Sequence, residues 1–144
     1  MIRLETYFNE AHKHIELITE SIEVLNPKIP IQDYDSLNQL ERFALNALIF
    51  RFSKLQDLIG VKIFRSYLDF SGFNVIEKEA IIDIDSWSEL RELRNKIAHE
   101  YPEEIDEMID SINLFIQNSS HLVAISNKLE ERYYEIKQKR DFNN

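Results

Sequence analysis

The chain has 144 residues, enough for one compact domain and too few for two. Its formal net charge of -9 argues against a protein that binds nucleic acid regardless of sequence, because such proteins usually carry a basic excess. The absence of cysteine excludes disulfides, thiol catalysis and cysteine-bound metals. With two glycines and three prolines, turns must be few, so we expect long helices rather than a β-sandwich or a Rossmann unit.

The beginning of the chain is charged and amphipathic and lacks the apolar core of a signal peptide. No apolar run approaches the ~20 residues that a membrane-spanning helix needs. We therefore expect a cytoplasmic protein without a membrane segment.

The first predicted element is an amphipathic helix over residues 4–25, where apolar residues alternate at steps of three and four. The helix is expected to end before Pro27, and the prolines of the segment 27–33 indicate a loop. Asp35 or Ser36 is then expected to cap the next helix.

The second predicted helix starts near Leu37 and is apolar nearly all round over residues 43–50. Such a helix must be covered on most sides, either inside a bundle or by a partner. Gly60 is a possible kink, and residues 71–72 are expected to end the helix. The span 73–85 is the least regular part of the chain, and we expect a loop or a short helical turn there.

The third predicted helix begins with a capping box at residues 86–89, in which Ser and Glu satisfy each other's backbone amides. It is expected to end near residues 99–100, because Pro102 disfavours the α conformation in the residue before it. Pro102 also suits the first turn of a fourth helix. The apolar seam of that helix runs to about Lys137 and leaves residues 138–144 as a frayed tail. The whole chain, 1–144, is thus predicted to be a single all-α domain, an up-down bundle of four or five helices.

One segment at the end of the third helix carries residues suited to chemistry on a phosphate. Arg94 presents a fixed fork of donors that matches phosphate oxygens. His99 has a reference pKa of ~6.5 and can exchange a proton near neutral pH. A fork of donors for phosphate oxygens and a group that can gain or lose a proton, placed in one segment, indicate a candidate site. No metal ligand set and no cofactor motif accompanies it.

The spacing of these two residues sets a geometric condition. Five residues along an ideal helix place Arg94 and His99 about 140° apart, so one regular helix cannot aim both at one phosphate. Either the helix unwinds before Pro102, or a second chain brings its own copy of the motif alongside. A two-fold dimer meets this condition and also covers the apolar second helix.

The segment Arg94-Asn95-x3-His99-x-Tyr101 resembles the Arg-Asn-x3-His-x-Tyr signature of HEPN domains, in particular the HepT-type toxins paired with MNT-type nucleotidyltransferases. The resemblance implies a four-helix-bundle homodimer that acts as a metal-independent endoribonuclease. Arg94 and His99 would be its catalytic pair and Asn95 their polar neighbour. Tyr101 would be the residue to which the cognate antitoxin transfers AMP.

Three charged residues on the second helix, Arg51, Lys54 and Asp57, are further candidates that would line the cleft and hold phosphate. Each candidate also has a purely structural interpretation. Arg51, Lys54 and Asp57 can pair with one another or extend along apolar surface to reach water. Arg94 can pair with Glu89 or Glu92 on its own helix.

His99 can simply cap the end of its helix, and Tyr101 can pack onto the fourth helix. At the level of function, two alternatives to a nuclease remain. One is a non-catalytic HEPN subunit that binds substrate for a two-component nucleotidyltransferase. The other is a helical scaffold in which the motif is coincidence.

The negative charge is concentrated around the motif. Residues 77–110 contain 12 acidic and four basic residues, whereas basic residues gather on the second helix. An acidic rim would weaken non-specific RNA binding and attract a basic antitoxin. The charge pattern therefore predicts a selective nuclease with low affinity for RNA.

Overall fold

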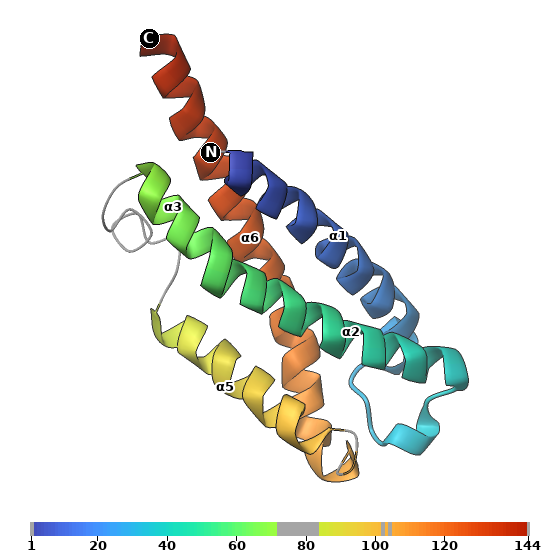
Figure 1. The fold of residues 1–144 in the computed structure, drawn as a ribbon. Coiled ribbons are helices and arrows are strands. Elements are labelled where there is room, and N and C mark those ends of the chain that lie inside the picture. Colours follow the sequence, from blue (N-terminus) through green and yellow to red (C-terminus); the bar gives the residue numbers. More distant parts are fainter. Residues whose placement is uncertain (1, 72–83, 102, 104, 144) are drawn as a thin grey trace.

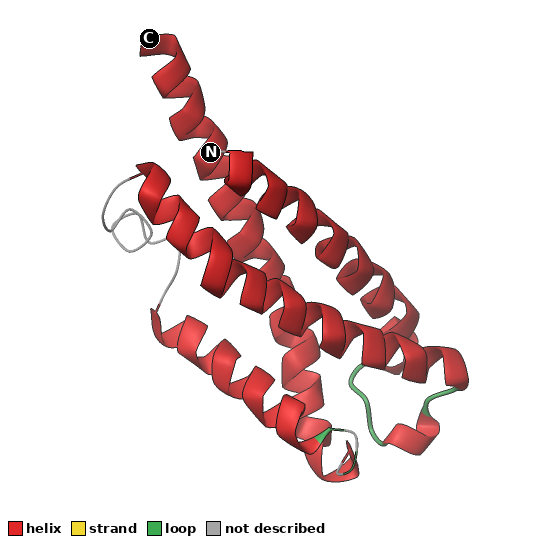
Figure 2. Ribbon diagram, viewed as in Figure 1, coloured by secondary structure: helices red, strands yellow, loops and turns green. Residues whose placement is uncertain are grey.

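In the described part of the chain, four long helical segments run alternately up and down and form an all-α bundle (Figure 1). The computed structural model describes residues 2–71, 84–101, 103 and 105–143. Within these ranges the secondary structure is helical and contains no strand (Figure 2). The α-helices are α1 (Ile2–Leu25), α2 (Gln39–Asp57), α3 (Phe64–Ser71), α5 (Ile84–Glu100) and α6 (Ile109–Asn143). A π-helix (Leu58–Ile63) joins α2 and α3 into one continuous segment, and short 3-10 helices span Asn26–Lys28, Tyr34–Ser36 and Ile105–Met108. The predicted helical bundle is confirmed.

The core lies where α1, α2 and α6 meet. α1 packs against α2 and α6, while α5 packs against α6 and α2. Aromatic rings fill the centre: the Phe52 and Phe115 centroids are 4.0 Å apart, and the Tyr133 ring contacts Phe8 and Phe70 at 5.6 and 4.8 Å. Burying an aromatic side chain stabilises the fold by about 1.5–3 kcal/mol, so these rings fix the three helices to one another.

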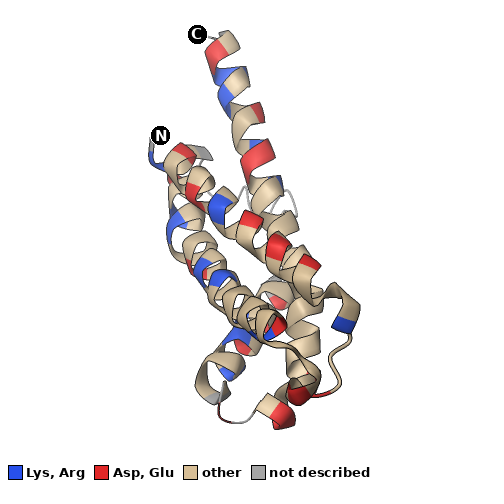
Figure 3. Cartoon of the chain, turned by 90° about the vertical axis from the view of Figure 1, so that its right-hand side faces the viewer, with Lys and Arg blue, Asp and Glu red and all other residues tan. Residues whose placement is uncertain are grey.

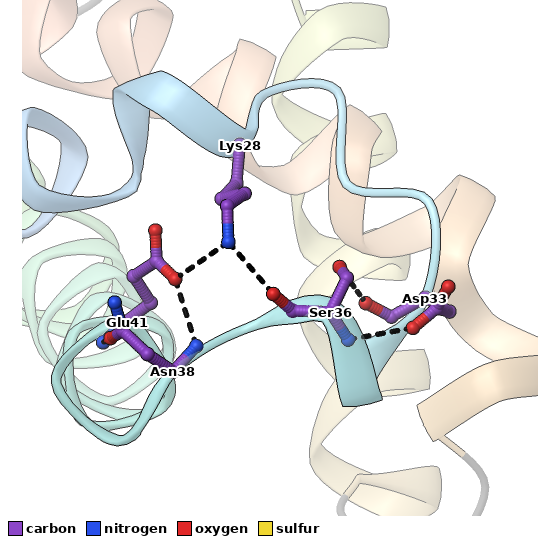
Figure 4. Close-up of polar contacts among 5 residues, drawn as sticks. All are labelled: Lys28, Asp33, Ser36, Asn38 and Glu41. Atoms are coloured by element: carbon purple, nitrogen blue, oxygen red, sulfur yellow. Dashed lines mark hydrogen bonds and ion pairs between the residues drawn. The ribbon is translucent and has the colours of Figure 1, made fainter.

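The connection between α1 and α2 is held by a polar network (Figure 4). Asn38 caps α2, because its side chain accepts from the Glu41 backbone N–H at 2.8 Å and the Glu41 carboxylate accepts from the Asn38 N–H at 2.8 Å. Lys28 donates to the Ser36 carbonyl and to Glu41 at 2.7 and 3.1 Å. Asp33 accepts from the Ser36 N–H at 2.7 Å and caps the 3-10 helix Tyr34–Ser36, which precedes α2. The predicted cap at Asp35 or Ser36 is therefore wrong.

The predicted end of α1 before Pro27 and the predicted end of α5 near residue 100 are confirmed. The predicted capping box at residues 86–89 is wrong, because Ile84 and Asp85 are already helical and the box lies inside α5. Most of the span 73–85, together with Gly72 and Pro102, lies outside the described residues.

α6 is longer than its apolar seam indicates. It continues to Asn143, so residues 138–143 are helical rather than frayed. Its last turns project beyond the start of α1, and acidic and basic residues alternate along them (Figure 3). The Arg140 guanidinium lies 4.3 Å from the centre of the Phe70 ring. This cation–π contact and the charged surface allow the helix to extend past its neighbours.

α2 has one buried face and one exposed face. Its inner face supplies Leu45, Leu48, Phe52 and Leu55 to the core. Its outer face exposes three large apolar side chains, with exposed fractions of 64% for Leu40, 58% for Phe43 and 52% for Phe50. The bundle therefore covers only part of the apolar surface that the sequence places on this helix.

Candidate functional site

Arg94 is held in place by two residues that the sequence also singles out. From α5, its guanidinium donates to the Asp57 carboxylate of α2 at 2.9 Å and to the Asn95 side-chain oxygen at 3.2 Å. The side chains of Arg94 and Asp57 are 30% and 53% exposed, so the pair lies at the surface. The alternative pairing of Arg94 within its own helix, to Glu89 or Glu92, is replaced by this bond between helices. Three predicted site residues thus come together.

Beside this pair lies a pocket of about 190 Å³ between the α2–π-helix segment and α5. Its lining combines two guanidinium groups, one carboxylate, two side-chain amides, one indole and two small or apolar positions: Arg91, Arg94, Asp57, Gln56, Asn95, Trp87, Gly60 and Val61. The lining thus places several polar groups beside one aromatic wall.

Gln56 is the most unusual member of the lining. Its residue is only 3% exposed, and neither its side-chain nitrogen nor its oxygen has a hydrogen-bond partner among the described residues. The Nε of Arg94 is also buried and unpartnered there. Each unpaired buried group costs about 1–3 kcal/mol, so polar residues without partners need an explanation. Both of these residues line the same pocket.

The π-helix shapes one wall of the pocket. A π-turn inserts one extra residue into a helix, and such insertions occur frequently at functional sites. Gly60 lies within it, and a Cβ at this position would stand 3.1 Å from Cζ2 of Trp87. The indole therefore approaches the helix backbone so closely that a Cβ at this position would push it back by a few tenths of an ångström. The indole also contacts the Phe64 ring, with centroids 5.0 Å apart.

The other two charged residues predicted on the second helix do not line this pocket. Arg51 and Lys54 lie over the exposed Phe50 ring instead, at 5.2 and 5.5 Å from its centre. An Arg51 N–H also lies 3.2 Å from Nδ1 of the buried His14. Burial and, secondarily, the charge of Arg51 lower the pKa of His14 below its usual 6.5, which favours a neutral imidazole that accepts from Arg51.

His99 and Tyr101 lie apart from the pocket. α5 remains helical through Glu100, so it does not unwind between Arg94 and His99, and the exposed imidazole of His99 points to a different side. Tyr101 is half-buried, and its N–H donates to the Ile97 carbonyl at 2.9 Å. Its hydroxyl is buried without a partner among the described residues, and burial raises the pKa of Tyr101 to about 12.

Sequence reasoning missed three residues of the site: Gln56, Trp87 as a pocket wall, and Arg91. One signal for Gln56 is present in the sequence, because it follows Phe52 by four residues and Leu48 by eight. This spacing places it on the buried face of α2, where the pattern demands an apolar residue. A lone amide on a core face is the type of irregularity that marks a site.

Among the residues with described positions, no group of three or more His, Asp or Glu side chains is arranged to hold a metal ion. None of the described helices is long and apolar enough to cross a membrane. Comparison with models of protein families, with characterised proteins and with solved structures gave no match. A function must therefore be inferred from the residues themselves.

Proposed function

We propose that this protein is a HEPN-type toxin, a metal-independent endoribonuclease in which Arg94 and His99 from two copies of the chain complete each active site. The observation that carries the proposal is the Arg94 guanidinium, oriented by Asp57 and Asn95 at the edge of a polar pocket. This fork stabilises charge on the phosphorane. His99 exchanges protons with the attacking 2′-hydroxyl or the leaving oxygen.

The regular geometry of α5 favours the two-chain arrangement. Because the helix does not unwind before its end at Glu100, Arg94 and His99 of one chain remain about 140° apart. A second copy related by a two-fold axis brings its His99 toward the first copy's Arg94, and the reverse holds at the other site.

The outer face of α2 supports a second copy as the partner. Leu40, Phe43, Phe50 and Asp57 follow one another at steps of three and seven, so they share one stripe of the helix. All four are exposed, and the stripe ends at the carboxylate that holds Arg94. A copy seated on this stripe therefore lies beside the site. Phe43→Glu is expected to produce a monomer by analytical ultracentrifugation, whereas Leu114→Glu, at an exposed apolar position of α6, is not.

Growth of a bacterial host tests the enzymatic role. Induction of the wild-type chain is expected to arrest growth, and Arg94→Ala and His99→Ala are expected to abolish the arrest. Arg65→Ala and His121→Ala remove one exposed residue of each type elsewhere and are expected to leave the arrest intact. If the wild type is as harmless as both site variants at equal expression, the nuclease is refuted and the non-catalytic substrate-binding subunit takes its place.

A mixing experiment tests the shared site. Neither Arg94→Ala nor His99→Ala is expected to cleave RNA alone. Mixed dimers pair the intact Arg94 of one copy with the intact His99 of the other, so an equal mixture recovers about a quarter of wild-type activity by the symmetry of the dimer. No recovery in a mixture shown to exchange subunits would mean that each chain uses its own two residues.

The partner that neutralises the toxin would be an MNT-type nucleotidyltransferase that transfers AMP from ATP to the Tyr101 hydroxyl and releases pyrophosphate. Because the Tyr101 hydroxyl is buried, this transfer requires the end of α5 to open when the partner binds. Co-expression with such an enzyme, followed by mass spectrometry, is expected to show an AMP adduct on the Tyr101 peptide and none in Tyr101→Phe. An unmodified Tyr101 peptide under these conditions removes this part of the proposal.

A further inference from the structure

The pocket beside Arg94 is the feature that the proposed cleavage leaves unexplained, because its buried amide takes no part in phosphate chemistry. We propose that it is a base-recognition pocket, in which Gln56 reads one nucleobase of single-stranded RNA next to the phosphate held by Arg94. This inference rests on the proposed function and explains how the proposed nuclease would select particular RNA sequences.

The unpaired amide of Gln56 is the first support. A glutamine side chain offers one N–H donor group and one carbonyl acceptor side by side. The Watson–Crick edge of every unpaired nucleobase presents a donor next to an acceptor, which an amide in the matching orientation can pair with. Gln56 lines the pocket with both groups unpartnered within the described structure and with 3% of the residue exposed. Because these two atoms are closed to solvent, the Gln56 side chain would have to turn toward the pocket, where a base would supply the hydrogen-bond partners that the fold does not.

The walls of the pocket supply the other two requirements. Trp87 provides an aromatic ring, and stacking on such a ring is the usual way in which proteins hold an unpaired base. Arg91 and Arg94 provide positive charge where the flanking phosphates would lie. The volume of about 190 Å³ is below the roughly 300–1,000 Å³ of pockets for drug-sized ligands, so it suits a single base.

Trp87 is the only tryptophan in the chain, so its fluorescence reports directly on this pocket. The protein is titrated with the 3′-monophosphates of adenosine, cytidine, guanosine and uridine, with ribose 5-phosphate, and with the four homotrinucleotides. Calorimetry follows the same titrations. We expect saturable quenching by one preferred base, both as a mononucleotide and within a trinucleotide.

Gln56→Leu removes both hydrogen-bonding groups at nearly constant size. It is expected to weaken binding of the preferred base by about tenfold or more and to bring all four bases to similar affinity. Gln117→Leu replaces an exposed glutamine of α6 and is expected to change nothing. Thermal unfolding of Gln56→Leu is expected to occur no lower than that of the wild type, because an unpaired buried amide is replaced by an apolar group.

Three outcomes overturn the inference. Ribose 5-phosphate could bind as tightly as the nucleoside monophosphates, or no probe could bind by either method. The third is a base preference that Gln56→Leu leaves unchanged. Binding of a mononucleotide but of no trinucleotide would assign the pocket to a free nucleotide and overturn its role in RNA. These titrations involve no cleavage. If the chain does not arrest growth but binds a base through Gln56, only the proposed nuclease activity is refuted. If the chain cleaves RNA but shows no base preference, only the base-recognition pocket is refuted.

Discussion

The ion pair between Arg94 and Asp57 is expected to matter for activity and hardly at all for folding. Its two side chains are 30% and 53% exposed, and their atoms are 2.9 Å apart. Water and salt screen such a pair, and exposed pairs contribute about 0.2–1 kcal/mol in double-mutant cycles. We therefore expect Arg94→Ala, Asp57→Ala and the double variant to give a coupling energy within that range in urea unfolding.

The chain contains a nearly matched reference pair. Arg132 and Glu135 of α6 lie 3.1 Å apart with exposed fractions of 29% and 53%. The cycle on this pair is expected to give a coupling energy of similar size. The functional outcomes should differ, because loss of a group that stabilises transition-state charge typically lowers turnover by about 100-fold to 1,000-fold. Arg94→Ala should thus abolish RNA cleavage while Arg132→Ala leaves it unchanged.

Two results would refute this reasoning. A coupling energy above about 2 kcal/mol for Arg94 and Asp57 would mean that the pair is a structural element, and the loss of activity would then follow from altered folding. Equal loss of cleavage in Arg94→Ala and Arg132→Ala would show that the assay does not depend on the proposed site.

Three further predictions follow from burial and charge. The lowered pKa of His14 means that the fold loses stability as pH falls below about 6.5, where the imidazole of the unfolded chain takes up a proton. His14→Gln keeps a polar group near Arg51. It should make the free energy of unfolding depend less on pH between pH 7 and 5. An unchanged slope would show that groups other than His14 determine this pH dependence. Tyr101→Phe removes a buried unpartnered hydroxyl and should leave the melting temperature equal or higher; a clear decrease would reveal a partner. The pocket has two arginines, so they can neutralise about two phosphates. A plot of the logarithm of the binding constant for single-stranded RNA against the logarithm of salt concentration should therefore have a slope no steeper than about -1.4, measured by fluorescence titration from low to moderate salt.

Much of the fold is predictable because it depends on local sequence. Periodic apolar residues specify α1, and prolines mark the ends of α1 and α5. The errors arise where a short motif matches a helix boundary but the actual boundary depends on the surrounding structure. The Ser and Glu of residues 86–89 match a capping box, yet the helix already includes Ile84. Likewise, α6 continues past Lys137 where its charged surface and a contact with α3 replace the apolar seam.

The site is only partly predictable, because it is assembled by packing. The sequence identifies Arg94, Asn95 and Asp57 as candidates, but their contact joins residues 37 positions apart and depends on how α2 and α5 pack. The same packing separates Arg51 from Arg94 and buries the hydroxyl of Tyr101, and no periodicity argument reaches either result.

The acidic net charge is compatible with the proposed anion-binding site because α5 places its basic residues Arg91 and Arg94 and its acidic residues Glu89 and Glu92 in different hollows. One side of the helix turns Arg91, Arg94 and the amide of Asn95 toward the pocket with Gln56. Glu89 and Glu92 line a different hollow between α5 and α6. A phosphate near the first side would meet two guanidinium groups at short range, one of them paired with the Asp57 carboxylate at 2.9 Å. Glu89 and Glu92 would act across the helix and be screened by water. Local placement, and not the chain's total charge of -9, therefore decides what this surface binds.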